Sequence, residues 1–287
     1  LLSASGNAKV LSLFGMSVGT SVAVINYISR IFTPIESLGM EIQTIQSAMA
    51  GVKRIDAFLA QPEREIPAEG KARARGDVAL SHVTFGYGDQ PVLRDFSMTV
   101  REGEQVTLVG RTGAGKSTIF RLLLGLYKPQ RGAITIGGVD VSQIADEERR
   151  ACIGCVEQHF SRVPGTVLDQ ITLGDPKITE AMARDAAKLA GLDDAILALP
   201  DGYAAECAEG MFSQGEWQLL SIARAAAANP VVLLLDEITA NLDAETEARV
   251  LAALRRAAEG RTVLSISHRV YGEEGARRVV IGGAEEK

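Results

Sequence analysis

Residues 105–124 read QVTLVGRTGAGKSTIFRLLL, and this stretch decides the fold class of the C-terminal part of the chain. It begins as an apolar run typical of a strand and ends with the apolar spacing of a helix. Between them, residues 110–117 match the pattern G-x-x-x-x-G-K-[ST], whose glycines let the backbone wrap a phosphate group. The N–H groups of such a loop and the positive end of the helix point at one place. The stretch therefore predicts a phosphate-binding loop between a buried strand and a helix.

Two side chains at the end of this loop suit a bound nucleotide. Lys116 would neutralise the β- and γ-phosphate oxygens of a nucleoside triphosphate, and the Ser117 hydroxyl can ligand Mg²⁺. Because the motif also has the right strand and helix around it, a chance glycine-rich turn is a poor alternative. We therefore expect the chain to bind ATP or GTP.

From about Asp77 onward, strand-like and helix-like runs alternate. The expected strands are VALSHVTF, FSMTV, QVTLVG, AITIGG, ACIGCVEQ, VVLLLDE and TVLSISH, and the expected helices are STIFRLLLGLY and residues 179–199, 214–228 and 244–258. This alternation predicts an α/β fold, and a continuous apolar strand such as Val231–Leu235 predicts burial on both faces of a sheet. We expect a P-loop NTPase domain built on a mostly parallel sheet.

The strand-like run VVLLLDE at 231–237 delivers two carboxylates at its C-terminal end, the edge at which open α/β sheets bind ligands. Asp236 suits a place in the Mg²⁺ shell, and Glu237 suits a base that polarises the attacking water. Taken alone, acidic residues that end a strand are often the solvated start of a loop. In a chain with a phosphate loop, we expect them to serve nucleotide hydrolysis.

The N-terminal part has a different pattern. Residues 10–29 carry no charge and are about long enough for a helix across a ~30 Å hydrocarbon core, although a buried soluble helix or two short segments also fit. Further on, apolar residues recur at steps of mostly three and four, which predicts one long helix, kinked at Pro34, that leaves an apolar environment and continues into water. This apolar stripe consists of Ile28, Ile31, Ile35, Leu38, Ile42, Ile45, Met49, Val52 and Leu59.

A change in composition separates the two parts. Residues 61–76, QPEREIPAEGKARARG, are charged, contain Pro and Gly and lack periodicity, which predicts a linker. We therefore expect a helical part at 1–60, a linker at 61–76 and the α/β domain at 77–287.

The overall composition is that of a globular protein, with 46% hydrophobic and 23% charged residues and a net charge of −6. A negative net charge argues against a surface devoted to nucleic acid. The 3 cysteines are an odd number, which favours a reducing compartment over a disulfide framework. Cys152-x-x-Cys155 has no second pair and falls in an expected strand, so it predicts two small buried side chains rather than a metal or redox site. We expect the folded bulk to be cytoplasmic.

Together with the phosphate loop and the Asp-Glu pair, three further features resemble the ATPase domain of ABC transporters. They are Gln158, the run MFSQGEWQLLSIARA at 211–225, and His268. The resemblance covers about 77–281, and its most specific element is Phe212–Glu216, FSQGE, which resembles the family signature LSGGQ. It implies ATP as the nucleotide, Mg²⁺ as the cofactor, a helical subdomain that carries the signature, and a second ABC subunit in a homodimer or heterodimer.

The resemblance assigns roles on the nucleotide side of the domain residue by residue. Tyr87 stacks on adenine, and Asp236 holds Mg²⁺ together with Ser117. Gln158 reaches Mg²⁺ and senses the membrane domain, while Glu237 is the catalytic base. The phosphate cradle consists of Gly113, Ala114, Gly115, Lys116, Ser117 and Thr118.

Other roles concern the opposite subunit or the γ-phosphate. Ser213 and Gly215 are the signature contacts to the γ-phosphate of a nucleotide held by the opposite subunit. Asp243 is the D-loop aspartate, and His268 is the γ-phosphate switch. Ser213 also precedes an Ala- and Leu-rich run, so we expect it to be an N-cap whose helix offers a second positive end to an anion. An ordinary hairpin tyrosine and a satisfied structural histidine are the alternatives for Tyr87 and His268.

The N-terminal segment indicates which kind of ABC transporter the chain resembles. SVGTSVAVINYISRIFTPIESL at 17–38 resembles the region around the last transmembrane helix of a type IV exporter half-transporter. This implies a place in the cell membrane with the ATPase domain in the cytoplasm, an unidentified transported substrate, and no nucleic-acid partner. A soluble ABC ATPase that is not linked to transport, in DNA repair or translation, is the alternative, as is the soluble ATPase subunit of an uptake system.

The chain also departs from the family pattern. Gln214 adds a side chain at a crowded position, and Glu216 adds an acid near phosphates, so we expect one site to turn over slowly. The tail after His268 lacks the usual aspartate-bearing strand and turn. The retained Glu237 and His268 argue against an inactive subunit.

Overall fold

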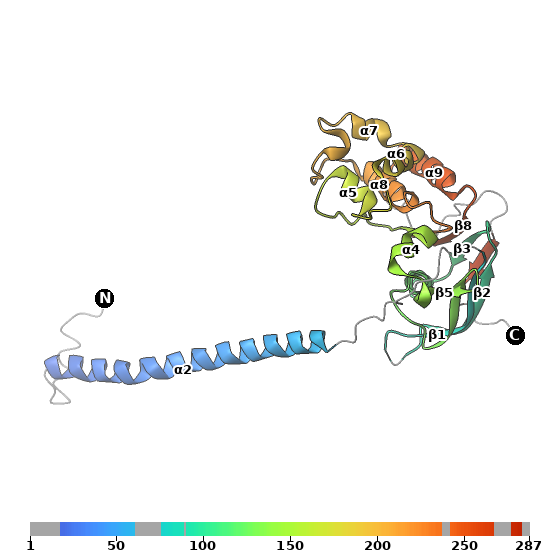
Figure 1. Ribbon diagram of the computed structural model, residues 1–287. Coiled ribbons are helices and arrows are strands. Elements are labelled where there is room, and N and C mark those ends of the chain that lie inside the picture. The colour runs from blue at the N-terminus through green and yellow to red at the C-terminus, as the bar shows by residue number, and fades with distance from the viewer. Residues whose placement is uncertain (1–17, 61–75, 89, 237–241, 267–276, 283–287) are drawn as a thin grey trace. The chain divides into compact units, whose positions relative to one another are not determined.

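The computed structural model describes residues 18–60, 76–88, 90–236, 242–266 and 277–282 (Figure 1). The chain divides into two compact units, Leu1–Glu65 and Ile66–Lys287. The expected linker at 61–76 lies almost entirely outside the described residues.

The first unit is a single long helix, α2 (Val18–Leu59), with Pro34 inside it. Every member of the apolar stripe that the sequence predicts is exposed on this helix, from 48% for Ile28 to 72% for Leu59. In the part of the chain that the structure describes, no helix combines the length and the apolar character needed to span a membrane. The segment before Val18 lies outside that part.

The second unit is built around a five-stranded sheet in which all neighbouring strands are parallel, as the sequence predicts. The strand order is β6-β7-β8-β3-β9. Leu233 and Leu235 pack on one face of the sheet, and Val232 and Leu234 pack on the other, which explains why this strand is apolar without alternation. The strands are β3 (Gln105–Val109), β6 (Ile153–Val156), β7 (Val232–Asp236), β8 (Thr262–Ile266) and β9 (Arg277–Val280).

A second, antiparallel sheet has the strand order β2-β1-β4-β5. The sequence pattern predicts its first three strands but not that they form a separate sheet. The strands are β1 (Val78–Phe85), β2 (Leu93–Val100), β4 (Arg131–Ile136) and β5 (Val139–Asp140).

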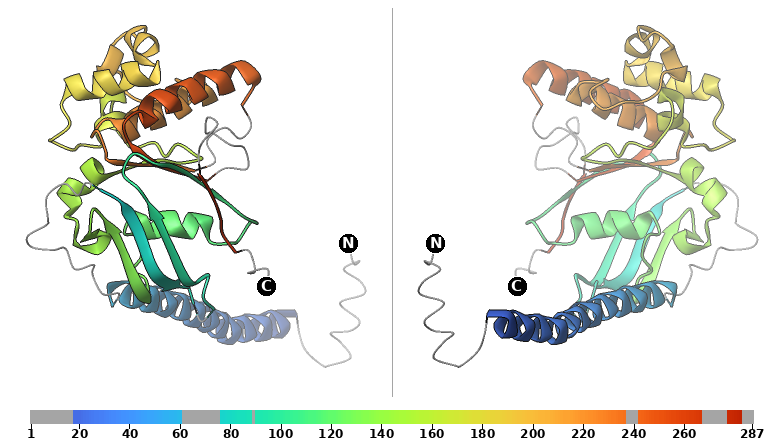
Figure 2. Two further views of the ribbon diagram at one scale, coloured as in Figure 1. Left: turned by 90° about the vertical axis from the view of Figure 1, so that its right-hand side faces the viewer. Right: turned by 90° about the vertical axis from the view of Figure 1, so that its left-hand side faces the viewer.

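The helices divide between the two faces of the parallel sheet. Helices α5 to α9 gather on one side and share one core with it, whereas α3 and the antiparallel sheet share a second core on the other side (Figures 1 and 2). The helices are α3 (Lys116–Leu123), α4 (Asp146–Cys152), α5 (Val167–Thr172), α6 (Glu180–Ala190), α7 (Asp193–Leu197), α8 (Gln214–Ala226) and α9 (Ala244–Ala258), with short 3₁₀ turns η1 (Val141–Gln143) and η2 (Gly202–Ala204).

Three expectations need correction. The helix expected at 179–199 is two helices, because Gly191 adopts a left-handed conformation (φ 75°) that ends α6. The strand expected from Ala151 begins only at Ile153, so Cys152 ends α4 and only Cys155 lies in a strand. The tail does contain a strand, β9, which pairs with β3, although it carries no aspartate.

Candidate functional site: a nucleotide pocket at the start of α3

The phosphate loop joins the end of β3 to the start of α3. Gly113 and Gly115 have φ angles of 82° and 101°, a region that favours glycine. A Cβ at Gly115 would lie 2.9 Å from Leu93 Cδ2 and 3.2 Å from Val92 Cγ1, so this loop position also lacks space for a side chain. Gly115 is the N-cap of α3 and has no side-chain cap hydrogen bond. The first N–H groups of α3 are therefore not satisfied by a cap side chain, as an anion site requires.

Lys116 is 7% exposed and folds back over the loop. Its Nζ donates to the carbonyl oxygen of Gly110 at 2.8 Å and to that of Arg111 at 3.1 Å. Both contacts are to neutral carbonyl groups, and an ammonium forms stronger hydrogen bonds with charged oxygens. The lysine is thus held at the loop by contacts that a phosphate can replace.

A pocket of about 450 Å³ opens beside this loop and brings together residues from distant parts of the sequence. Tyr87 comes from the turn after β1, Gln158 follows β6, and Asp236 ends β7. Ala114 packs against the neighbouring core and does not line the pocket. The lining residues are Tyr87, Val92, Thr112, Gly113, Gly115, Lys116, Ser117, Thr118, Gln158 and Asp236.

The oxygen-bearing side chains in this pocket are suitable ligands for a magnesium ion. The Ser117 hydroxyl, the Gln158 amide and the Asp236 carboxylate all line it, and each offers an oxygen ligand. Mg²⁺ prefers oxygen ligands and is usually held by one or two carboxylates together with substrate phosphates. A pocket with one carboxylate beside a phosphate loop has this chemistry.

Tyr87 is 49% exposed and lines the pocket, and its ring packs edge-on against two other aromatic rings. Its centroid lies 5.1 Å from that of Phe85 at an interplanar angle of 86°, and 5.2 Å from that of Tyr127 at 85°. Edge-to-face pairs at these distances are favourable. Tyr127 was not among the predicted site residues, although it follows the helix of the phosphate loop by only four residues.

The signature residues form a separate site at the start of α8. Ser213 is the N-cap, as the sequence predicts, and it forms a capping box with Glu216. Ser213 N and Ser213 Oγ donate to Glu216 Oε2 at 2.8 and 2.7 Å, and Glu216 N donates to Ser213 Oγ at 3.3 Å. A Cβ on Gly215 would lie 2.2 Å from Thr246 Cγ2, so close packing against α9 requires glycine here.

Asp243 is the N-cap of α9 and accepts hydrogen bonds from Glu245 N at 3.1 Å and Thr246 N at 3.0 Å. Neither Asp243 nor the signature residues Ser213 and Gly215 line the nucleotide pocket. Within the described part of one chain, the two groups of predicted site residues are therefore not brought together. Glu237 and His268 lie outside the described residues.

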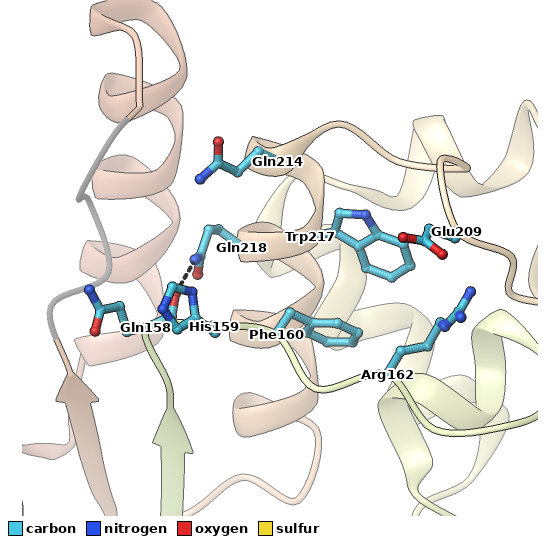
Figure 3. Close-up of a pocket in the computed structure, with 8 residues that line it drawn as sticks. All are labelled: Gln158, His159, Phe160, Arg162, Glu209, Gln214, Trp217 and Gln218. Atoms are coloured by element: carbon cyan, nitrogen blue, oxygen red, sulfur yellow. Dashed lines mark hydrogen bonds between the residues drawn. The ribbon is translucent and has the colours of Figure 1, made fainter.

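Gln158 also lines a second pocket, of about 380 Å³, at the N-terminal part of α8 (Figure 3). The carbonyl oxygen of Gln158 accepts a hydrogen bond from Gln218 Nε2 at 2.8 Å. Nearby, the rings of Phe160 and Trp217 stack with centroids 5.0 Å apart, and the Arg224 guanidinium lies 4.0 Å from the centroid of Phe160. The segment that carries Gln158 is therefore anchored on the same helix that carries the signature.

Cys152 and Cys155 do not form a reactive pair in this structure. Cys152 is buried, and burial raises the pKa of the Cys155 thiol to about 12. A thiol that stays protonated is a poor nucleophile and a poor metal ligand. This agrees with the prediction of a small structural role for both, with Cys152 buried and Cys155 partly buried.

Comparisons with known proteins agree with this geometry. The sequence profile of the ABC transporter family matches residues 93–240. The mycobactin import ATP-binding/permease protein IrtB of Mycolicibacterium smegmatis is 38% identical over 98% of this chain and 50% of its own length. A fatty acid ABC transporter ATP-binding/permease protein of Mycobacterium bovis is 35% identical over 89% of this chain and 41% of its own length.

Among solved structures, a bacterial Atm1-family ABC exporter with ATP bound matches with a TM-score of 0.69 and 34% identity, over 92% of this chain and 48% of that one. The chain thus spans about half the length of the relatives that it matches. The profile match and the extent of these alignments place the chain in the ABC transporter family, with an ABC-type ATPase domain in its second unit.

Proposed function

We propose that this chain is the ATP-hydrolysing part of an exporter-type half-transporter, joined to the end of its transmembrane domain. In this proposal, ATP-driven closure of a dimer moves a substrate across the cell membrane. The nucleotide part of the proposal rests on one observation, which is that Tyr87, the phosphate loop, Gln158 and Asp236 line the same pocket. Relatives named as ATP-binding/permease proteins support the transport part.

The residues of the pocket bind and orient ATP. The triphosphate lies at the start of α3, where Lys116 exchanges its carbonyl partners for phosphate oxygens, and the base stacks on Tyr87. Ser117, Gln158 and Asp236 would hold Mg²⁺, which would supply positive charge to stabilise the phosphates in the transition state. Glu237, which directly follows Asp236, takes a proton from the attacking water.

Most of the remaining roles require a second subunit. Ser213 and Gly215 at the start of α8 contact the γ-phosphate of ATP on the opposite subunit, with Asp243 nearby. His268 contacts the γ-phosphate of its own site. The proposal is supported by the position of Ser213 as the N-cap of a long helix, because such a helix start attracts anions.

The membrane part rests on the N-terminal segment. We place this segment in the cell membrane and the ATPase domain in the cytoplasm, with no nucleic-acid partner. The exposed apolar side chains of α2 support a location in which other apolar groups cover them. Fractionation of cells that produce the full-length gene product tests this placement, and recovery of that product with the soluble proteins would contradict it.

The nucleotide site is tested by Lys116→Ala in the whole chain. Loss of a charge that forms hydrogen bonds of ~1.5–3 kcal/mol each to phosphate oxygens should weaken ATP binding more than about 100-fold. Calorimetric titration with ATP and Mg²⁺ measures the affinity. Lys177→Ala is the matched control, because Lys177 is an exposed lysine whose nearest partner is Glu148 at 2.6 Å. An affinity of Lys116→Ala within about twofold of the parent would refute the site.

A further inference from the structure

The hydroxyl group of Tyr87 lies between two residues of α3. Arg121 Nη1 donates to Tyr87 Oη at 3.0 Å, and Tyr87 Oη lies 3.3 Å from Thr118 Oγ1. A guanidinium group can only donate, so the phenolic hydrogen of Tyr87 is free to point at the Thr118 hydroxyl. The three side chains therefore form a chain of hydrogen bonds from Arg121 through Tyr87 to Thr118.

Thr118 and Arg121 are three residues apart in the same helix, so they lie on one face of α3. That helix begins at Lys116, directly after the phosphate loop. The hydrogen bonds therefore tie the ring that is proposed to hold the base to the helix that is proposed to hold the phosphates. The ring and the cradle are set at one spacing before any nucleotide arrives.

Burial alone does not fix the orientation of Tyr87, since the residue is 49% exposed. Its ring has edge contacts with Phe85 and Tyr127, and the Arg121 guanidinium carbon lies 5.7 Å from the ring centroid. Arg121 is itself exposed, and within the described part of the chain its guanidinium group has a hydrogen bond only with Tyr87. A structural role in the core is therefore a poor explanation for this arginine.

We propose that Arg121 is a positioning residue for the nucleotide, which acts by holding the Tyr87 ring beside the phosphate loop. The inference rests on the proposed function, because it concerns the same pocket. Ordering a free aromatic side chain when a ligand binds costs affinity, and a ring that is already held avoids this cost. Arg121 thus acts on nucleotide binding through Tyr87, without a contact of its own to the reacting phosphate.

A double-mutant cycle in the whole chain tests this relation. Tyr87→Phe keeps the ring and removes the hydroxyl, while Arg121→Ala removes the donor. Each should weaken ATP binding about two- to tenfold, the range expected for one hydrogen bond. The double variant should bind no more weakly than either single variant, because both changes remove the same interaction.

Kinetics and two further variants separate positioning from a general effect on the fold. The KM for ATP should rise in Arg121→Ala while kcat stays at the parent value, since no reacting group changes. Arg121→Lys should restore most of the affinity, because an ammonium can also donate to the Tyr87 hydroxyl. Arg255→Ala, at an exposed arginine in the last turn of α9, is the matched control and should change neither parameter.

Three results would overturn the inference. They are an unchanged ATP affinity in Arg121→Ala, losses that multiply in the double variant, and a fall of kcat with KM unchanged. Lys116→Ala distinguishes this failure from failure of the proposed function. If Lys116→Ala abolishes ATP binding and Arg121→Ala does not weaken it, only the positioning role is wrong. If Lys116→Ala binds ATP as the parent does, the nucleotide site itself is wrong.

Discussion

The starts of α3 and α8 are two helix N-termini with opposite local chemistry. At α3, the N-cap is a glycine without a side-chain cap, and the next residue is Lys116. At α8, a capping box pairs Ser213 with Glu216, so that the N–H groups of these two residues have side-chain acceptors. Since every helix starts with N–H groups that need acceptors, the first start is prepared for an external anion, whereas the second is already partly occupied by its own side chains.

This difference indicates that the two starts would contribute to ATP binding in different ways. The α3 start can bind phosphate within one chain. At the α8 start, Ser213 Oγ donates to Glu216 Oε2 at 2.7 Å. This hydrogen bond must break before the Ser213 hydroxyl can donate to a phosphate bound by another subunit. ATP binding to a single chain should therefore not depend on α8, whereas ATP-dependent dimer formation should.

The largest expected effect comes from Glu237→Gln. Removal of the basic lone pair should lower ATP hydrolysis by about 10²–10⁴-fold, the range expected for a lost general base. ATP binding should survive, and unhydrolysed ATP with Mg²⁺ should shift the chain to a dimer on a sizing column. Glu259→Gln, at an exposed residue after α9, is the control. Hydrolysis at the parent rate would contradict the role of Glu237.

The contribution of α8 is isolated by adding Ser213→Arg to Glu237→Gln. The bulky cation blocks the start of α8 and leaves the phosphate loop intact. ATP should still bind to each chain with the affinity of Glu237→Gln alone, but the ATP-dependent dimer should be lost. A dimer that persists in the double variant would show that Ser213 is not part of the contact between subunits.

A smaller effect is expected from Glu216→Gln in the same Glu237→Gln background. The amide oxygen of glutamine can keep the capping hydrogen bonds, but the negative charge next to an incoming phosphate is gone. Charges at a helix N-terminus are worth ~0.3–1 kcal/mol, so the ATP-dependent dimer should form at about two- to fivefold lower protein concentration. The melting temperature should fall slightly, because the same charge stabilises α8. Glu245→Gln, in the first turn of α9, is the matched control. If Glu216→Gln left dimer formation unchanged, the Glu216 carboxylate would not compete with the incoming phosphate for the start of α8.

The smallest effect concerns Asp243 at a third helix start. Hydrogen bonds from Thr246 and neighbouring backbone groups hold the pKa of Asp243 below its ordinary value of 3.8. A lowered folded-state pKa means that the stabilisation is present at neutral pH and is lost as the pH falls through the acidic range below about 4. Asp243→Asn should therefore show a flatter fall in melting temperature between about pH 6 and 3 than the parent. Parallel curves for the two proteins would contradict a capping role for the carboxylate.

Much of the ATPase domain could be predicted because its signals are local. The run at 105–124 contains a strand, a glycine loop and a helix in immediate succession, and the structure has β3 and α3 there. The N-cap at Ser213 could also be predicted, since a capping residue and its helix are neighbours in sequence. The end of α6 at Gly191 was missed although its signal is local, since a glycine directly after a helical run is a common end of a helix.

The separate antiparallel sheet could not be predicted in the same way. Its strands β1 and β4 pair across the whole of β3 and α3, and strand pairing between distant segments leaves no mark in the local pattern. For the apolar stripe of α2, by contrast, the local pattern was sufficient to predict the element. Its spacing predicted the helix, but the pattern cannot say which surface covers the exposed side chains.

By itself, the sequence determined the phosphate loop, the residue types of the nucleotide pocket and the start of the signature helix, because each depends on neighbours within a few residues. Only the tertiary structure decided that Tyr87, Gln158 and Asp236 line one pocket, and that Arg121 reaches the hydroxyl of Tyr87. These contacts join residues 34 or more positions apart, and they exist only after the sheets have paired and α3 has packed beneath the parallel sheet. The physical reason is that a side chain's chemistry is local, whereas its partners are set by how distant strands and helices pack into a common core.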